Sequence, residues 1–315
     1  MKAAIVERYG APDVVRLVES PTPEPRTGQV RVRVAVTAVT AGDARIRGAR
    51  FPKGFGPLAR LMFGVRGPRR KVLGNVFSGT VDAVGAGVTD LSPGDEVCGM
   101  TGPGMGAHAE YVVVAAARAV PKPAGVSHED AAGVLFGGTT ALFFLRDKAA
   151  LKPGASVLVN GASGAVGTNA VQLARHFGAR VTGVTSTPNL ALVTELGAEH
   201  TVDYTSTDLA SLTDRFDVVL DTVGNLSPTS GRRLLNGGGV LLLAAAGLWE
   251  LVGARGNVRA GAAPERPEDF AFLLGLVAEG NLTPVTDRID PIEEIAQAYR
   301  RADSGRKVGN ALIRP

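Results

Sequence analysis

The residue types and spacing that could do chemistry lie in one glycine-rich turn, Gly161-Ala162-Ser163-Gly164-Ala165-Val166-Gly167. Gly161 can adopt a tight conformation that is closed to residues with a Cβ, and Gly164 lets the backbone approach a pyrophosphate. Gly167 lets a helix pack closely against a strand. Free backbone N–H groups and the positive helix end would then point at phosphate oxygens. The turn predicts a dinucleotide site, and an ordinary glycine-rich turn is the alternative.

The segments around this turn are typical of a βαβ unit. A β-branched run over 157–160 precedes the turn, and a second strand ends near Thr185. The helix between them places apolar residues on one face at the spacing of a 3.6-residue period: Val166, Ala170, Leu173 and Ala174. Ala162 stands where the commonest fingerprint has its first glycine. A position between strand and helix is nevertheless the context that supports the dinucleotide interpretation.

The end of the second strand favours one dinucleotide over the other. An NAD site usually has a carboxylate about 20 residues after the turn to bind the ribose 2′-hydroxyl. Here hydroxyls take that place, on Thr185, Ser186 and Thr187. Hydroxyls can bond a 2′-phosphate that a carboxylate would repel, so NADPH is favoured over NADH. NADH stays open as the alternative, because Pro188 and Asn189 occupy the places where a cation would help.

Composition bounds the class of protein. A chain of 315 residues with 45% hydrophobic residues, 20% charged residues and 41 glycines is typical of a soluble α/β protein, and this length suggests about two domains. The first ten residues carry charges where a signal peptide needs an apolar core. No apolar run approaches the roughly 18 residues of a membrane span. One cysteine, Cys98, allows no intrachain disulfide. We expect a cytoplasmic protein without a membrane partner.

The net charge of +4 comes from one segment. Residues 49–71 hold seven basic residues and no acid, and the rest of the chain carries −3. We therefore expect no nucleic-acid partner. Apolar residues are interleaved with these charges, at Phe51, Phe55, Leu58, Leu61, Met62 and Phe63. We interpret 49–71 as a loop, either a mobile lid for an aromatic or acidic substrate or a solvated loop with a few anchors.

The order of segments predicts two domains. Short alternating strands separated by glycine, proline and aspartate turns indicate a β-barrel-like domain, at 2–7, 14–19, 29–39, 72–85, 94–100 and 107–120. The pattern becomes helical from Ser127. Later apolar strands suit a parallel sheet covered on both faces, at 200–204, 216–224 and 238–246. Helices are predicted at 188–196, 267–280 and 291–303, before a last strand from Asn310.

Several motifs in this order resemble the medium-chain dehydrogenase/reductase superfamily, in its zinc-lacking, quinone oxidoreductase-like branch. They are GDEVCGM, AEYVVV, VLVNGASGAVG, ELGAEHTVDY, DTVG and GRKVGNALI. The resemblance implies an α/β fold with a GroES-like β-barrel domain over 1–123, completed by 284–315. It also implies a Rossmann doubly wound parallel sheet over 124–283, a cofactor cleft between the two, and a homodimer formed through an exposed edge of the Rossmann sheet.

Departures from the zinc-dependent members bear on the mechanism. Their ligand turn Cys-Gly-x-Asp matches residues 40–43, so that Thr40 replaces the cysteine. Their Gly-His-Glu motif matches residues 74–76, so that Asn75 replaces the histidine and Val76 the glutamate. A catalytic zinc needs about three N, S or O ligands, and the four histidines are scattered. We predict no metal. Acceptors that are already activated, quinones and α,β-unsaturated carbonyls, then suit hydride transfer from NADPH.

The resemblance also implies further site residues. Thr140 would lie near the nicotinamide ribose, and Tyr204 belongs to a cofactor-side segment. Two loops would line the nicotinamide, with Val223, Gly224, Ala244, Ala245, Ala246 and Gly247. Lys307 and Asn310, in the C-terminal segment, would reach back to the cofactor. Asn189, which follows the second strand, is a further candidate for cofactor binding. Thr40 and Asn75 are the substrate-side candidates, each with a structural role as the alternative.

Three functions stay open. The leading one is a zinc-independent, NADPH-dependent reductase of quinones or enones. A pathway-specific enoyl or ketone reductase of secondary metabolism is the second, and an NADPH-binding sensor or structural protein with little turnover is the third. A short-chain dehydrogenase is set aside, because no tyrosine is followed four residues later by lysine. Trp249 has two interpretations, a substrate contact or a residue packed under a loop.

Overall fold

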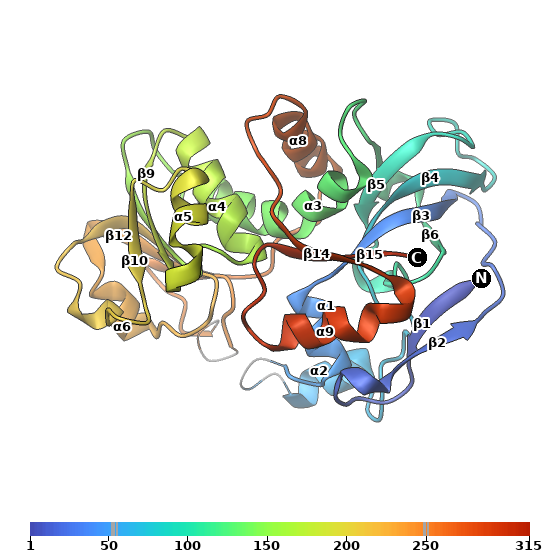
Figure 1. The fold of residues 1–315 in the computed structure, drawn as a ribbon, viewed down its shortest axis with the longest axis horizontal. Coiled ribbons are helices and arrows are strands. Elements are labelled where there is room, and N and C mark those ends of the chain that lie inside the picture. Colours follow the sequence, from blue (N-terminus) through green and yellow to red (C-terminus); the bar gives the residue numbers. More distant parts are fainter. Residues whose placement is uncertain (52–53, 55, 248–249, 251) are drawn as a thin grey trace.

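A computed structural model describes residues 1–51, 54, 56–247, 250 and 252–315. The chain forms a six-stranded sheet and a seven-stranded sheet, which lie on opposite sides of the molecule in Figure 1 with helices between them. A separate two-stranded sheet pairs β1 (Lys2–Val6) with β2 (Val15–Glu19). Among the described residues, no helix has the length and apolar character needed to cross a membrane. The architecture is α/β, as the sequence predicts.

The six-stranded sheet is parallel and doubly wound. Its strands, in spatial order, are β10 (His200–Asp203), β9 (Arg180–Thr185), β8 (Ser156–Asn160), β11 (Phe216–Asp221), β12 (Leu235–Leu243) and β13 (Val258–Ala260). The chain runs outward from β8 through β9 to β10, and from β11 through β12 to β13 in the opposite direction. The order therefore reverses between β8 and β11. Ligands of such sheets bind beyond the carboxyl ends of the strands at this switch point.

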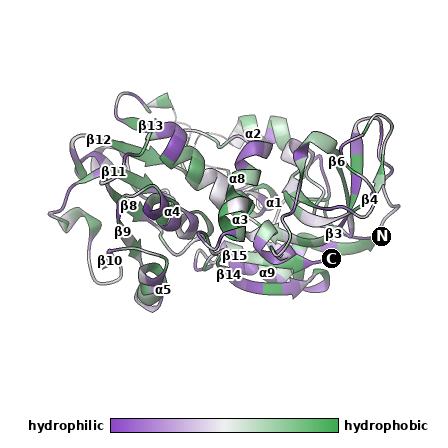
Figure 2. Ribbon diagram, turned by 90° about the horizontal axis from the view of Figure 1, so that it is seen from above, coloured by the Kyte–Doolittle hydropathy of each residue, from purple (hydrophilic) through white to green (hydrophobic). Residues whose placement is uncertain are grey.

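Helices cover both faces of this sheet, which explains its apolar strands. Val157 and Val159 of β8 pack into the core that contains α3, α4 and α8, and Leu158 packs into the core on the other face. Figure 2 colours β11 and β12 mainly as hydrophobic. The helices of this half are α3 (His128–Leu142), α4 (Ala165–His176), α5 (Leu190–Glu195), α6 (Pro228–Arg232) and α8 (Pro267–Ala278).

The seven-stranded sheet joins the two ends of the chain. Its strands are β14 (Thr286–Pro291), β15 (Asn310–Arg314), β3 (Gln29–Val39), β4 (Val76–Val84), β5 (Glu96–Met100) and β7 (Ala119–Pro121), with β6 (Tyr111–Ala115) paired to β3. Strand β15 lies antiparallel to β3, with Leu312 opposite Ala38. Helix α9 (Ile295–Asp303) packs nearby in Figure 1. The predicted boundaries at 123/124 and 283/284 fall between the strands of the two sheets and stay a prediction.

Two helices occur where the sequence predicts none. Helix α1 (Ala41–Arg47) follows β3 directly, and α2 (Gly56–Phe63) lies inside the segment interpreted as a loop. The loop prediction for 49–71 is therefore wrong for its middle part. The ring of Phe51 stacks on Phe63 at 5.7 Å, and the Tyr9 hydroxyl donates to the Gly64 carbonyl at 2.6 Å. The interpretations of Phe55 and Trp249 concern residues outside the described ones.

Several predicted strands end earlier or divide. The strand predicted at 216–224 ends at Asp221, because the chain turns there around that carboxylate. The segment 107–120 divides into β6 and β7 around a short 3₁₀ turn at Ala116–Arg118. The helix predicted from Ser127 is confirmed, and the Ser127 hydroxyl accepts from the Asp130 N–H at 3.0 Å. A π-helical turn at Phe143–Lys148 extends it.

Candidate active site

The glycine turn has the geometry that its sequence predicts. Gly161 has a φ of +85°, and a Cβ there would lie 2.5 Å from Thr222 Oγ1. A Cβ at Gly167 would lie 2.0 Å from the Gly161 carbonyl oxygen. Both positions therefore exclude a side chain. Ala162 is fully buried behind the turn.

The first turn of α4 fits a pyrophosphate. Its N-cap is Gly164, no side chain caps the helix, and a Cβ at Gly164 would meet no atom closer than 3.5 Å. The first N–H groups of a helix have no partner within the helix. Those of Val166 and Gly167 are thus available to bind phosphate oxygens, and Gly164 forms a parallel bridge with Gly309 beside them. The residues present fit a dinucleotide.

The C-terminal segment lies against this turn. The Gly309 N–H donates to the Ser163 carbonyl at 2.8 Å, and Lys307 Nζ donates to the Gly309 carbonyl. Burial lowers the pKa of Lys307 to about 8. Asn310 Nδ2 donates to the Val285 carbonyl at 2.9 Å, so its amide holds the segment in place. The structure therefore brings Lys307 and the phosphate turn together.

A cluster of polar side chains lies at the ends of β9 and β10. Ser163 Oγ accepts from Thr185 Oγ1 at 2.8 Å and from Asn189 Nδ2 at 3.3 Å. Asn189 Nδ2 also donates to Ser186 Oγ at 3.1 Å. The predicted ribose-side residues are thus neighbours of the phosphate turn. Tyr204 is exposed, and its backbone N–H donates to the Thr185 carbonyl.

Sequence reasoning missed Asp203, which adds a carboxylate to this cluster. Asp203 is the last residue of β10, and its Oδ2 accepts from Thr187 Oγ1 at 2.5 Å. Hydrogen bonds from the side chains of Thr187 and Thr205 lower the pKa of Asp203. The signal was available, because neighbouring parallel strands end at the same edge of a sheet. The carboxylate of an NAD site is expected at the end of the second strand, whereas Asp203 ends the neighbouring strand.

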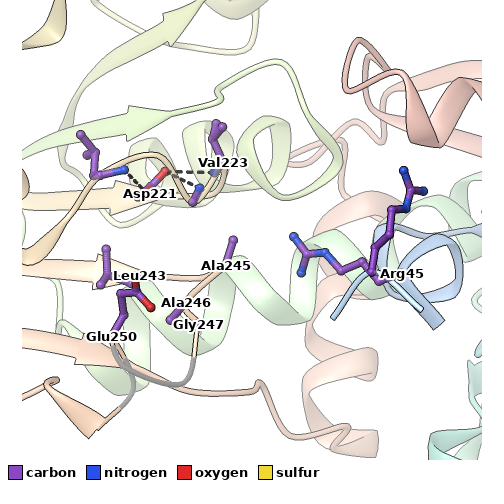
Figure 3. Close-up of a pocket in the computed structure, with 11 residues that line it drawn as sticks. Arg45, Asp221, Val223, Leu243, Ala245, Ala246, Gly247 and Glu250 are labelled. Atoms are coloured by element: carbon purple, nitrogen blue, oxygen red, sulfur yellow. Dashed lines mark hydrogen bonds between the residues drawn. The ribbon is translucent and has the colours of Figure 1, made fainter. Parts of the chain in front are cut away.

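Asp221, at the end of β11, organises the loop beyond the switch point. Its Oδ1 accepts from the N–H groups of Val223 at 3.0 Å and Gly224 at 3.1 Å, and from Asn160 Nδ2 at 2.9 Å. Its Oδ2 accepts from the Leu226 N–H at 3.0 Å. The dashed lines in Figure 3 mark bonds of this carboxylate. One buried side chain therefore fixes the whole loop.

A pocket of about 210 Å³ opens beside this loop (Figure 3). One side is formed by Val223 and Gly224 and by the segment after β12, with Ala245, Ala246 and Gly247. Ala244 lies behind that segment and donates its N–H to the Asp221 carbonyl. Arg45 and Arg50 come from the α1 region and line the pocket too. The Thr140 hydroxyl donates to the Phe136 carbonyl within α3.

The two substrate-side candidates are linked by Asp43. Thr40 is the N-cap of α1, where its hydroxyl donates to Asp43 Oδ2 at 2.6 Å and accepts from the Asp43 N–H. Asp43 Oδ1 accepts from the Gly74 N–H at 3.1 Å, which holds the turn that carries Asn75. Asn75 Oδ1 is buried and has no hydrogen-bond partner among the described residues. Their catalytic roles stay predictions.

Family models match both halves of the chain. The alcohol dehydrogenase GroES-like domain matches residues 26–124, and the zinc-binding dehydrogenase model matches residues 196–313. The 2-methylene-furan-3-one reductase of Solanum lycopersicum is 31% identical over all of this chain and 79% of its own length. The chain belongs to the medium-chain dehydrogenase/reductase superfamily, in its quinone oxidoreductase-like branch.

Further relatives of this medium-chain protein have related names. A chloroplastic NADPH-dependent alkenal/one oxidoreductase of Arabidopsis thaliana is 30% identical, over all of this chain and 80% of the relative. A quinone oxidoreductase of Pseudomonas aeruginosa is 29% identical over 98% of this chain and 97% of the relative.

Solved structures share the fold. The quinone oxidoreductase from Coxiella burnetii matches all of this chain and 99% of its own, with a TM-score of 0.88 and 29% identity. An NAD-dependent alcohol dehydrogenase matches with a TM-score of 0.84 and 29% identity. A mycobacterial protein complexed with NADPH matches with a TM-score of 0.82 and 26% identity. Each of these two is matched over its full length, as is this chain.

The zinc ligands of other members of the superfamily have no counterpart in the described part of this chain. No group of three or more His, Cys, Asp or Glu side chains there could hold a metal ion. His108 is buried, and its Nδ1 lies 3.2 Å from the Tyr299 hydroxyl and its Nε2 3.1 Å from the Ala38 carbonyl. Burial raises the pKa of Cys98 to about 12. Zinc independence stays a prediction.

Proposed function

We propose that this protein is a zinc-independent, NADPH-dependent oxidoreductase that reduces a quinone or an α,β-unsaturated carbonyl compound. The observation that carries the proposal is the open, uncapped first turn of α4 beside a pocket beyond the switch point. The names of the quinone and alkenal/one oxidoreductases support it. The lack of a metal-ligand cluster in the described residues is consistent with acceptors that need no Lewis acid.

In this proposal the chain binds and orients. The turn from Gly161 to Gly167 and Lys307 hold the pyrophosphate, and Asp221 holds the loop at the nicotinamide end. When bound there, NADPH would supply a hydride to the electrophilic carbon of the acceptor, and water would supply the proton. The side-chain amide of Asn75 carries N–H groups that would donate to the oxygen on which negative charge develops.

NADPH is our choice of cofactor. The hydroxyls of Ser163 and Ser186 accept hydrogen bonds from Thr185 and Asn189, and each keeps its own proton to donate to a 2′-phosphate. Asp203 acts against this choice, because its carboxylate repels a phosphate near Thr187. Two comparisons support NADPH, the alkenal/one oxidoreductase and the mycobacterial complex. Comparing the dissociation constants of NADPH and NADH tests the choice directly, and tighter binding of NADH would reverse it.

The activity is tested by following nicotinamide absorbance with a panel of quinones, enones and simple ketones, with and without a chelator. We expect oxidation of NADPH by quinones or enones at the same rate with the chelator. Tight binding of NADPH without turnover of any acceptor would favour an NADPH-binding sensor or structural protein, or a pathway-specific reductase with one biosynthetic substrate. Loss of activity with the chelator would contradict zinc independence.

A further inference from the structure

The pocket has one strongly basic wall. Arg45, on α1, and Arg50, just after it, line the pocket together with the two loops that end β11 and β12. In Figure 3 Arg45 lies across the pocket from Val223 and Ala245. Because those loops form the proposed nicotinamide side of the pocket, an acceptor stacked on the nicotinamide would have a guanidinium on its other side. Arginine presents its N–H groups in a planar fork that matches a carboxylate.

Arg45 has no anionic partner among the described residues. It is half-buried, and it forms none of the ion pairs found in that part of the chain. Burial, and then the neighbouring charge of Arg50, lower the pKa of Arg45. A partly buried cation without a counter-ion is unfavourable. Binding of an anion in the pocket would relieve that cost.

The surroundings of Arg45 add positive charge instead of neutralising it. Arg47 and Arg50 both form ion pairs with Asp303, and Arg47 is 1% exposed. Two guanidiniums thus share the Asp303 carboxylate, and Arg45 has none among the described residues. Asp303 is already occupied by these two guanidiniums, so it leaves Arg45 unneutralised. The wall has a net positive charge, which attracts anions.

Two carboxylates line the pocket as well, and neither neutralises Arg45. The oxygens of Asp221 accept from three backbone N–H groups and one amide, so its charge is satisfied within its own loop. Glu250 lies beside Leu243 in Figure 3, away from Arg45. Its Oε2 is buried and has no partner among the described residues. The pocket therefore has a basic side and an acidic side.

We propose that the pocket selects acceptors that carry a carboxylate, and that Arg45 binds this carboxylate. The proposal rests on the proposed function and deepens it, because it names the substrate class: small α,β-unsaturated carbonyl compounds with an acid group. Arg50, already paired to Asp303, adds positive charge at the entrance. The double bond would then face the nicotinamide held by the Val223 and Ala245 loops, and the acid group would face Arg45 on α1.

A matched pair of substrates tests the proposal. trans-6-Oxohept-4-enoate and its methyl ester present the same enone with and without a negative charge, because two methylene groups separate the acid group from the double bond. We expect a higher kcat/KM for the acid. Arg45→Gln should lower kcat/KM for the acid by about 10- to 100-fold, because a hydrogen bond to a charged group is lost. The same substitution should change kcat/KM for the ester by less than about 3-fold. Arg45→Lys keeps the charge but loses the fork, so its effect should be intermediate.

Arg70→Gln is the matched control. It removes one positive charge from an exposed position in the same basic segment, outside the residues that line the pocket. Arg70→Gln should leave kcat/KM unchanged for both the acid and the ester. Equal losses for acid and ester in Arg45→Gln would overturn the proposal, as would equal losses in Arg70→Gln and Arg45→Gln. Glu250→Gln should raise kcat/KM for the acid. If it lowered kcat/KM equally for the acid and the ester, Glu250 would instead form an ion pair that closes the cleft.

Binding without turnover separates this proposal from the proposed function. 6-Oxoheptanoate and its methyl ester should be compared by NMR titration of the protein saturated with NADP⁺. The acid should bind more tightly, and Arg45→Gln should abolish the difference, even in a preparation that reduces no enone. If Arg45→Gln weakened binding of NADPH and left the acid and ester unchanged, Arg45 would serve a cofactor phosphate and the proposal would be wrong.

Discussion

At the scale of single residues, two glycines of the phosphate turn have different tolerances. Gly164 has a φ of −79°, and the nearest atom to a Cβ there would be the Gly161 carbonyl oxygen at 3.5 Å, which is an ordinary van der Waals contact. A Cβ at Gly167 would instead lie 2.0 Å from a carbonyl oxygen and 2.7 Å from Ala162 Cα. The first position is constrained by what binds there, and the second by the fold itself.

We therefore predict opposite results for two alanine substitutions. Gly164→Ala should keep nearly the wild-type melting temperature and bind NADPH at least about 10-fold more weakly, because the methyl group occupies the place of the pyrophosphate. Gly167→Ala should lower the melting temperature, because backbone atoms must move. Thermal unfolding and fluorescence titration measure both. Unchanged affinity in Gly164→Ala would contradict the placement of the pyrophosphate.

Lys307 predicts a pH dependence of cofactor binding. Burial lowers its pKa from 10.5 to about 8 in the free protein. A bound phosphate favours the charged lysine, so binding takes up a proton once the pH exceeds about 8. The affinity for NADPH should therefore fall above about pH 8, by up to about 10-fold per pH unit. Titration at several pH values measures this. Lys307→Met should remove this pH dependence. If the affinity of the wild-type protein for NADPH did not change up to about pH 9.5, the prediction would be wrong.

At the scale of elements, α1 positions the substrate side of the site. Its capping box joins Thr40 to Asp43, and Asp43 also bonds the Gly74 N–H. The same helix presents Arg45 to the pocket. Helix α1 and its N-cap therefore hold Thr40, the turn at Gly74 and Arg45 in one arrangement.

Substitutions at Thr40 separate capping from catalysis. Thr40→Ala should lower the free energy of unfolding by about 1 kcal/mol, because the helix loses its cap. Thr40→Ser keeps the hydroxyl and should keep both stability and activity. Denaturant unfolding and kcat/KM for an enone are the measurements. A large loss of activity in Thr40→Ala, with wild-type stability, would assign the hydroxyl to substrate instead of to the helix.

The sequence predicted the apolar parallel strands better than the helices on the substrate side. The parallel strands are apolar on both faces, and the resulting runs locate β8, β11 and β12 to within a few residues. Helix α1 is short and bounded by glycine, which leaves too few residues for a helical period. The basic wall of the pocket could not be predicted at all. It depends on how Arg45 lies against loops about 180 residues later in the chain, and only tertiary packing determines that.

At the scale of the whole molecule, the site lies where two sheets meet. The six-stranded sheet supplies the phosphate turn and the nicotinamide-side loops, and the seven-stranded half supplies α1 and the Asn75 turn. The C-terminal segment passes the phosphate turn before it enters the second sheet as β15. Movement of one half against the other would therefore change the pocket and the cofactor site together.

We also propose that two copies associate through an edge of the six-stranded sheet. Strand β13 is one such edge, with Arg259 exposed between two buried residues. Analytical ultracentrifugation should give twice the mass of one chain at micromolar concentration. Arg259→Pro disturbs this edge and should increase the fraction of single chains. A single chain at all concentrations would contradict the dimer.

The central claim is that this chain places a dinucleotide so that its hydride reaches the β-carbon of an activated acceptor. The most direct test uses NADPH deuterated at C4 of the nicotinamide, on the face that the enzyme uses, with an enone acceptor and NMR analysis of the product. The account predicts one deuterium at the β-carbon and a proton from solvent at the α-carbon. Deuterium at the carbonyl carbon, or a reduced product without deuterium from either C4 position, would contradict it.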